Sequence, residues 1–89
     1  MAMKIKDGFI LREVAGQWLV VPLGERVVEF NGMITLSESG ALIWKALETE
    51  SSVDDLVAKV LSEYDIDEAT ARADVDEFLG MMREKELLA

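Results

Sequence analysis

The chain of 89 residues contains neither cysteine nor histidine. These two absences exclude disulfide bonds, thiolate nucleophiles and histidine general bases, together with the usual nitrogen and sulfur ligands of zinc. A chain without disulfides is most simply assigned to a reducing cytoplasm. With so few groups capable of covalent chemistry, the protein is expected to hold a partner rather than to transform a substrate.

Long apolar runs are also missing. The longest uninterrupted run covers residues 18–23, far short of the roughly 20 residues that a membrane-spanning helix needs. The first seven residues, which include Lys4, Lys6 and Asp7, lack the apolar stretch of a signal peptide. We therefore expect a soluble protein with no membrane partner. Its apolar fraction of 51% is high enough for the chain to fold.

Basic residues are scarce, and their distribution is uneven. Residues 1–47 hold five acidic and five basic side chains, whereas residues 48–89 hold thirteen acidic and four basic ones. The second half therefore carries the entire net charge of −9. Such a surface repels phosphate backbones, and its simplest role is to keep helix faces solvated. No nucleic-acid partner is expected.

Acidic side chains remain as candidates for a metal or catalytic site. Asp65 and Asp67 begin like a calcium loop, but residues 68–70 supply neither a third ligand nor the glycine that the turn requires. No carboxylate pair is singled out by its spacing, and there is no phosphate-binding glycine loop or nucleophile motif. We predict no catalytic residue, no metal site and no cofactor.

The first part of the chain has the pattern of β-strands. Residues 9–14 and 17–22 are rich in apolar and β-branched side chains, with Ala15-Gly16 as a turn between them. Asn31-Gly32 supplies the positive φ angles of a type I′ turn and predicts a hairpin between residues 27–30 and 33–36. Three strands are expected, with residues 27–30 as a candidate fourth.

The remaining chain has the pattern of three helices. The first is expected over residues 38–48, capped by Ser37 or Ser39. The second follows Ser52, which resembles the start of a capping box with Asp55. The third follows Asp65 or Asp67 and extends to about Glu86. Its apolar stripe is Ala71, Val75, Phe78, Leu79 and Met82. The predicted fold is a single α+β domain over residues 1–89, similar to a winged helix-turn-helix, with three or four antiparallel N-terminal strands followed by three helices.

The strand over residues 33–36 is the candidate binding element. If it lies at a sheet edge beside the third helix, an extended peptide can pair with it, while neighbouring apolar side chains select the sequence. The simplest alternative is a strand edge that the protein's own loop covers. A further alternative is a small interaction or regulatory module that dimerises through the same edge.

A set of loose hydrophobic motifs runs through residues 32–88. They are Gly32-Met33-Ile34-x-Leu36, Gly40, Ile43-Trp44, Leu47, Ser52-Val53-Asp54-Asp55-Leu56, Tyr64-Asp65-Ile66-Asp67, Asp74-Val75, Phe78-Leu79 and Leu87-Leu88. With these motifs the chain resembles the PqqD family, named after coenzyme PQQ synthesis protein D.

The resemblance implies a RiPP recognition element, a winged-helix module that binds the leader of a ribosomally made precursor peptide. Such modules present the leader to a modifying enzyme, commonly a radical SAM protein, and a monomer or weak dimer is expected. In the family the leader adds to the strand before the first long helix and packs against the third. The corresponding positions here are Met33, Ile34, Thr35, Leu36, Ala71, Val75, Phe78, Leu79 and Met82.

One departure from the family pattern bears on binding. The segment over residues 23–31 is longer than in members from the PQQ pathway. If residues 27–30 pair with residues 33–36, they occupy one side of the docking strand. The acidic helical half is also expected to favour leaders that carry Lys or Arg beside their apolar anchors.

Overall fold

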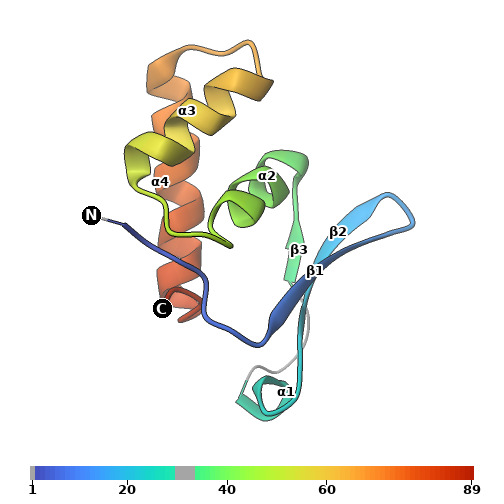
Figure 1. Ribbon diagram of the computed structural model, residues 1–89. Coiled ribbons are helices and arrows are strands. Elements are labelled where there is room, and N and C mark those ends of the chain that lie inside the picture. The colour runs from blue at the N-terminus through green and yellow to red at the C-terminus, as the bar shows by residue number, and fades with distance from the viewer. Residues whose placement is uncertain (1, 30–33) are drawn as a thin grey trace.

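A computed structural model describes residues 2–29 and 34–89 of the chain, including the side chains of all these residues except 28 and 29. Three antiparallel strands in the first part are followed by three longer helices (Figure 1). The elements are β1 (Phe9–Val14), β2 (Gln17–Pro22), α1 (Arg26–Glu29), β3 (Ile34–Leu36), α2 (Glu38–Ala46), α3 (Val53–Glu63) and α4 (Glu68–Glu84).

The strands form one sheet in the order β1-β2-β3. The turn between β1 and β2 is built from Ala15 and Gly16, whose φ angles are 52° and 78°, as the sequence predicted. In the second pairing Trp18 lies opposite Leu36 and Leu19 opposite Thr35. Because side chains alternate along a strand, Leu36 is buried toward the helices while Thr35 is exposed on the other face.

The assignment of residues 27–30 as a candidate fourth strand is wrong for residues 27–29. Residues 26–29 form the short helix α1, in which the backbone N–H groups of Arg26 and Val27 bond to the carbonyls of Leu23 and Gly24 at 3.0 and 3.2 Å. The Arg26 side chain fixes this turn by donating from Nε to the carbonyl of Asp7 at 2.9 Å. These local bonds override the β propensity of the two valines. Phe30, the predicted Asn31-Gly32 turn and Met33 lie outside the described residues.

Polar side chains cap the three longer helices at positions that the sequence indicated. Ser37 Oγ accepts from the N–H of Gly40 at 3.1 Å, so Ser37 rather than Ser39 caps α2. Ser52 and Asp55 form a complete capping box at α3. Asp67, not Asp65, caps α4. Each cap satisfies N–H groups that have no partner within the helix.

The core lies between the sheet and the three long helices. Trp44 is 1% exposed and packs edge to face with Phe9 at 6.4 Å between ring centroids. The apolar stripe predicted for the third helix is buried along its whole length, at Ala71, Val75, Phe78, Leu79 and Met82. The largest side chains below 2% exposure are Trp44, Ile43, Leu47, Leu56, Leu79, Met82, Leu87, Val20, Val60 and Val75.

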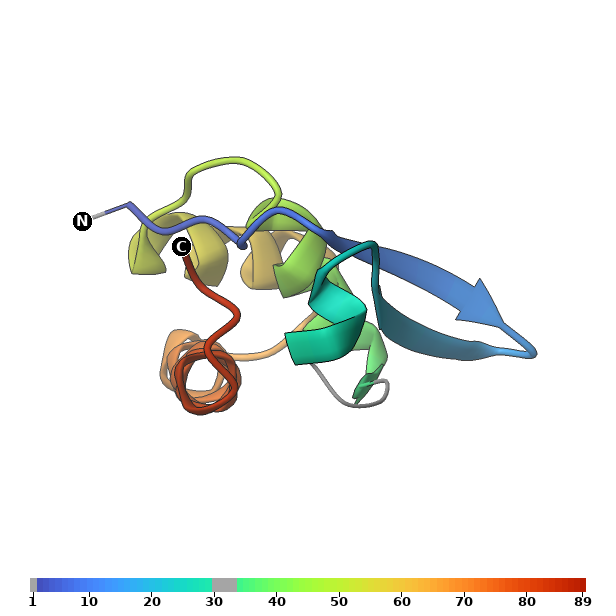
Figure 2. The ribbon, with the colours of Figure 1, turned by 90° about the horizontal axis from the view of Figure 1, so that it is seen from below.

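The two ends of the described chain meet beside α4 (Figure 1). Met3 bridges to Ser51, and Ile5 bridges to Leu88. Figure 2 shows the β1-β2 hairpin projecting away from the helices, whereas this terminal segment lies across them. Within residues 2–29 and 34–89, no helix has the length and apolar character needed to cross a membrane.

Candidate peptide-binding site

β3 is an edge strand of the described sheet. Its one paired neighbour there is β2, so one side of β3 has no strand partner among residues 2–29 and 34–89. An edge strand presents alternate N–H and C=O groups on its outer side, and a further strand can pair with them. The misassignment of residues 27–29 matters here because a fourth strand at that position was the expected obstacle.

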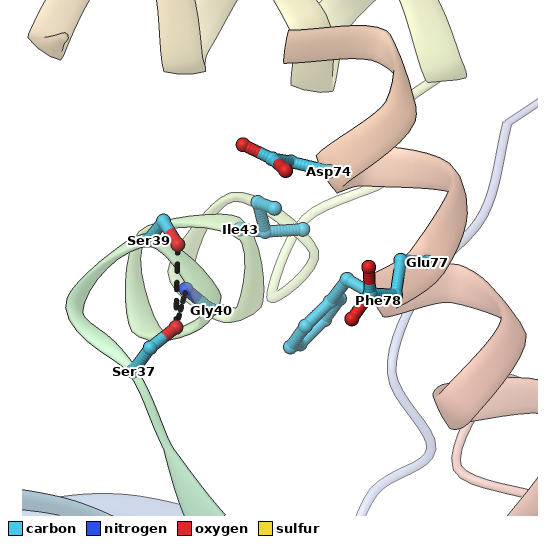
Figure 3. A pocket seen from close by; sticks show the side chains of 7 residues that line it. All are labelled: Ser37, Ser39, Gly40, Ile43, Asp74, Glu77 and Phe78. Carbon is cyan, nitrogen blue, oxygen red and sulfur yellow. Dashed lines mark hydrogen bonds between the residues drawn. The ribbon is translucent and has the colours of Figure 1, made fainter. Parts of the chain in front are cut away.

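A cavity of about 160 Å³ opens where β3 ends and α2 begins. Ser37 follows the last residue of β3 directly and lines this cavity. The opposite wall comes from α4 (Figure 3). The lining residues are Ser37, Ser39, Gly40, Ile43, Asp74, Glu77 and Phe78. An extended segment paired with β3 would therefore pass the mouth of this cavity.

Phe78 and Gly40 hold the two walls close together. A Cβ atom at position 40 would lie 3.2 Å from Cε1 of Phe78, 3.3 Å from Oγ of Ser37 and 3.5 Å from Cβ of Leu36. Contacts of 3.2–3.3 Å are tight for a methyl group, so glycine lets α2 approach Phe78. A glycine in the first turn of a predicted helix is the sequence signal that could have located this wall.

The structure places some of the predicted site residues at the surface of the candidate site and buries the others behind it. Thr35 is exposed and Ile34 half-buried on β3, and Phe78 lines the cavity from α4. Leu36 is buried beside Gly40, and Met33 lies outside the described residues. The other helix positions are at most 1% exposed and support the wall from within: Ala71, Val75, Leu79 and Met82.

The amphipathic pattern selected side chains that point into the core, and for this reason it missed polar positions on the cavity rim. Asp74 and Glu77 stand on either side of the buried Val75, on the exposed surface of α4. Figure 3 shows the carboxylate of Asp74 extending over the space between α4 and α2. The sequence shows that most charged residues of α4 are acidic, but the helical period does not single out these two.

Basic side chains of α4 are engaged elsewhere. Arg72 lies 3.2 Å from Asp54 and 3.5 Å from Glu68, and the hydrogen bond to Asp54 raises the pKa of Arg72 above its usual value. Arg83 donates to the sulfur of Met3 at 3.8 Å. The cavity rim is therefore acidic.

A larger hollow of about 460 Å³ lies at the chain ends, where Met3, Val53 and Leu88 meet Arg83. It adjoins the short backbone bridges of the terminal segment rather than an unpaired strand edge. Within the described part of the chain, no group of three or more acidic residues is placed to hold a metal ion.

The edge of β3 and the cavity beside it together have the arrangement of a site that binds an extended peptide.

Comparison with known proteins assigns this module to a family. Residues 17–88 match the family model described as coenzyme PQQ synthesis protein D (PqqD), and the chain belongs to this family. Among solved structures, the fold is similar to that of TbiB1 in complex with the TbiA(beta) leader peptide. The TM-score is 0.77 and the sequence identity 27%, over 97% of this chain and 94% of that one. A search of curated proteins returned no match.

The family assignment agrees with the architecture of three antiparallel strands followed by three long helices. Proteins of this family are non-catalytic peptide-binding proteins of the RiPP recognition type, so the chain is not an enzyme.

Proposed function

We propose that this protein captures the leader of a ribosomally made precursor peptide by strand addition to β3 and presents it to a modifying enzyme. The observation that carries this proposal is the unpaired side of β3 in the described sheet, which leads directly into the cavity walled by Phe78. TbiB1, which has the same fold, is in complex with a leader peptide. Residues 1–89 act as one peptide-recognition domain in this proposal.

β3 is the better docking edge of the sheet. The outer edge of β1 belongs to the hairpin that projects away from the helices (Figure 2), and Arg12, Glu13 and Val14 on it are exposed. Leu36, the last residue of β3, lies close to Gly40, and Gly40 lies close to the ring of Phe78. A peptide on β3 therefore gains both backbone bonds and side-chain burial, whereas a peptide on the outer part of β1 gains mainly backbone bonds.

Backbone pairing alone would not hold a peptide. Three to five hydrogen bonds at about 1 kcal/mol each give roughly 3–5 kcal/mol. The loss of translational and rotational freedom on association costs about 4–15 kcal/mol. Apolar anchors of the leader must supply the difference. Phe78 offers the contact surface, and the buried residues Ala71, Val75, Leu79 and Met82 keep it in place.

The modifying enzyme is proposed to be a radical SAM protein, as the family pattern implies. A precursor made on the ribosome meets its enzyme in the cytoplasm, which is the proposed location. Genes for a short precursor peptide and for a radical SAM enzyme are therefore expected next to the gene of this protein.

Thr35→Pro tests strand addition. Proline removes a backbone N–H donor from the three-residue strand β3, and its ring disturbs the extended pairing, so affinity for the leader should fall at least tenfold. The ligand is the fluorescently labelled N-terminal part of the neighbouring precursor, and binding is followed by anisotropy. Far-ultraviolet circular dichroism should show the helices intact.

Thr35→Val is the matched control, because valine keeps the N–H group and the branched shape. Its affinity should stay close to that of the parent protein. Equal affinities of the proline and valine variants would contradict strand addition to β3.

A further inference from the structure

Two carboxylates line the α4 side of the cavity. Asp74 and Glu77 are both exposed and line it together with Phe78. They are three residues apart on one helix, so their side chains are neighbours on the same face. Figure 3 places them above and beside the Phe78 ring.

Within the part of the chain that the structure describes, neither carboxylate forms an ion pair with a basic side chain. Arg72 is bound by Asp54 and Glu68 instead. With all lining residues counted, the cavity carries two negative charges and no positive one. Its charge therefore favours a cation.

The cavity lining includes two apolar side chains. Phe78 is 8% exposed and Ile43 1% exposed, and both contribute to the lining. The volume of about 160 Å³ is several times what a single water molecule needs. That is room for a slender side chain with a methylene stem, which can rest on an aromatic ring while its charged head reaches polar groups at the rim.

We propose that this cavity is the subsite for one lysine or arginine side chain of the bound leader, with its stem on Phe78 and its head between Asp74 and Glu77. The inference rests on the proposed function, since strand addition to β3 brings the side chain to the cavity mouth at Ser37. It names the chemistry that the leader must carry at one position.

A purely structural role for the two carboxylates makes a different prediction. α2 begins at this cavity, and the N-terminal end of a helix carries partial positive charge. If Asp74 and Glu77 served only to balance this charge, neutralising them would lower the stability of the protein. It would not change which peptides bind.

The test begins with a displayed library of random linear peptides of about 16 residues, selected on the immobilised parent protein. The expected peptides share apolar positions and have Lys or Arg enriched at one fixed spacing from them. A parallel selection on Asp74→Asn/Glu77→Gln should return the apolar positions without the basic one. The control variant Asp76→Asn/Glu84→Gln removes the same charge from exposed positions of α4 outside the cavity and should keep the basic preference.

The affinities of the parent protein and of Asp74→Asn/Glu77→Gln are then measured for one selected lysine peptide and for its Lys→Met version. These four affinities form a double-mutant cycle. Exposed pairs are weak and screened by salt, so the double cavity variant should lose about 2- to 10-fold in affinity for the lysine peptide at moderate salt. It should lose almost nothing for the methionine peptide. A double Asp74→Lys/Glu77→Lys variant should prefer the corresponding Lys→Glu peptide.

The outcomes separate the two proposals. Apolar peptides without a basic preference would overturn the lysine or arginine subsite and leave strand addition standing. Lower stability of the double cavity variant with an unchanged peptide preference would assign the carboxylates to α2 and also overturn the subsite. If no peptide pairs with β3, the proposed function itself fails.

Discussion

At the residue scale, the site depends on positions that serve packing and access together. Gly40 allows α2 to lie against Phe78, and Phe78 is both part of the core cluster and the cavity wall. Sequence patterns predicted Phe78 because it falls on the apolar stripe of α4. They could not separate it from Val75 and Leu79, because a helical period reports burial and not which buried ring also borders a cavity.

Gly40→Leu should close the site. The added side chain meets Phe78 and Ser37 at once, so it fills the cavity and overpacks the contact between α2 and α4. We expect at least a tenfold loss of leader affinity and a loss of about 1–3 kcal/mol in the free energy of unfolding. Anisotropy and urea denaturation measure the two effects.

Gly80→Ala is the control for that variant. Gly80 is exposed within α4, and a Cβ there would have no atom of the described residues within 4 Å apart from its chain neighbours and the backbone of its own helix. Alanine should stabilise the helix by about 0.5–1 kcal/mol and leave binding unchanged. Leader affinity retained in Gly40→Leu would contradict the assignment of this cavity to the leader.

At the element scale, the starts of the helices were predictable from the sequence, because a polar capping residue fixes each of them. Ser52, Asp55 and Asp67 have the spacing of helix starts, and all three act as caps. Residues 27–29 were misassigned because the Val-Val pair has β propensity, whereas the deciding bonds come from the turn at residues 23–24 and from the contact of Arg26 with Asp7. That last contact joins segments 19 residues apart, which local patterns do not reveal.

The caps also predict how stability responds to acid. The N–H of Ser52, with its hydroxyl, holds the pKa of Asp55 below its ordinary value of 3.8, and the hydroxyl and N–H of Thr70 do the same for Asp67. A carboxyl group whose pKa is lower in the folded state stabilises the protein above its unfolded pKa. This contribution is lost as the pH falls through the lower, folded value.

Urea denaturation at a series of pH values from about 6 to 2 measures this loss. The free energy of unfolding should decline mainly below the ordinary pKa of 3.8. Asp55→Asn/Asp67→Asn keeps side chains that can cap a helix but removes both titrating groups. Its stability should depend less steeply on pH, and an unchanged slope would show that other groups control the acid response.

At the scale of the whole molecule, the strand order β1-β2-β3 determines which strand lies at the edge beside the helices. The side of β3 that has no strand partner among the described residues could accept a leader or a second copy of the protein. Overall fold class was predictable because strands precede helices in clear blocks. The helical turn at residues 27–29, which keeps them from pairing with β3, was not predictable, since it depends on contacts with distant residues.

Sedimentation velocity without peptide separates these two uses of the edge. With a net charge of −9, two copies repel each other, so the free protein should sediment as a monomer over a wide range of concentrations. A stable dimer that dissociates when Thr35 is changed to proline would favour the alternative module that pairs through β3.

Backbone hydrogen exchange with and without bound leader tests the central claim most directly. Strand addition predicts slower exchange for at least one amide of residues 34–36, together with changes at the cavity residues Gly40 and Phe78. Amides of β1 should be unaffected. Protection confined to β1 or to the hollow at the chain ends, with residues 34–36 unchanged, would contradict capture of the leader at this edge.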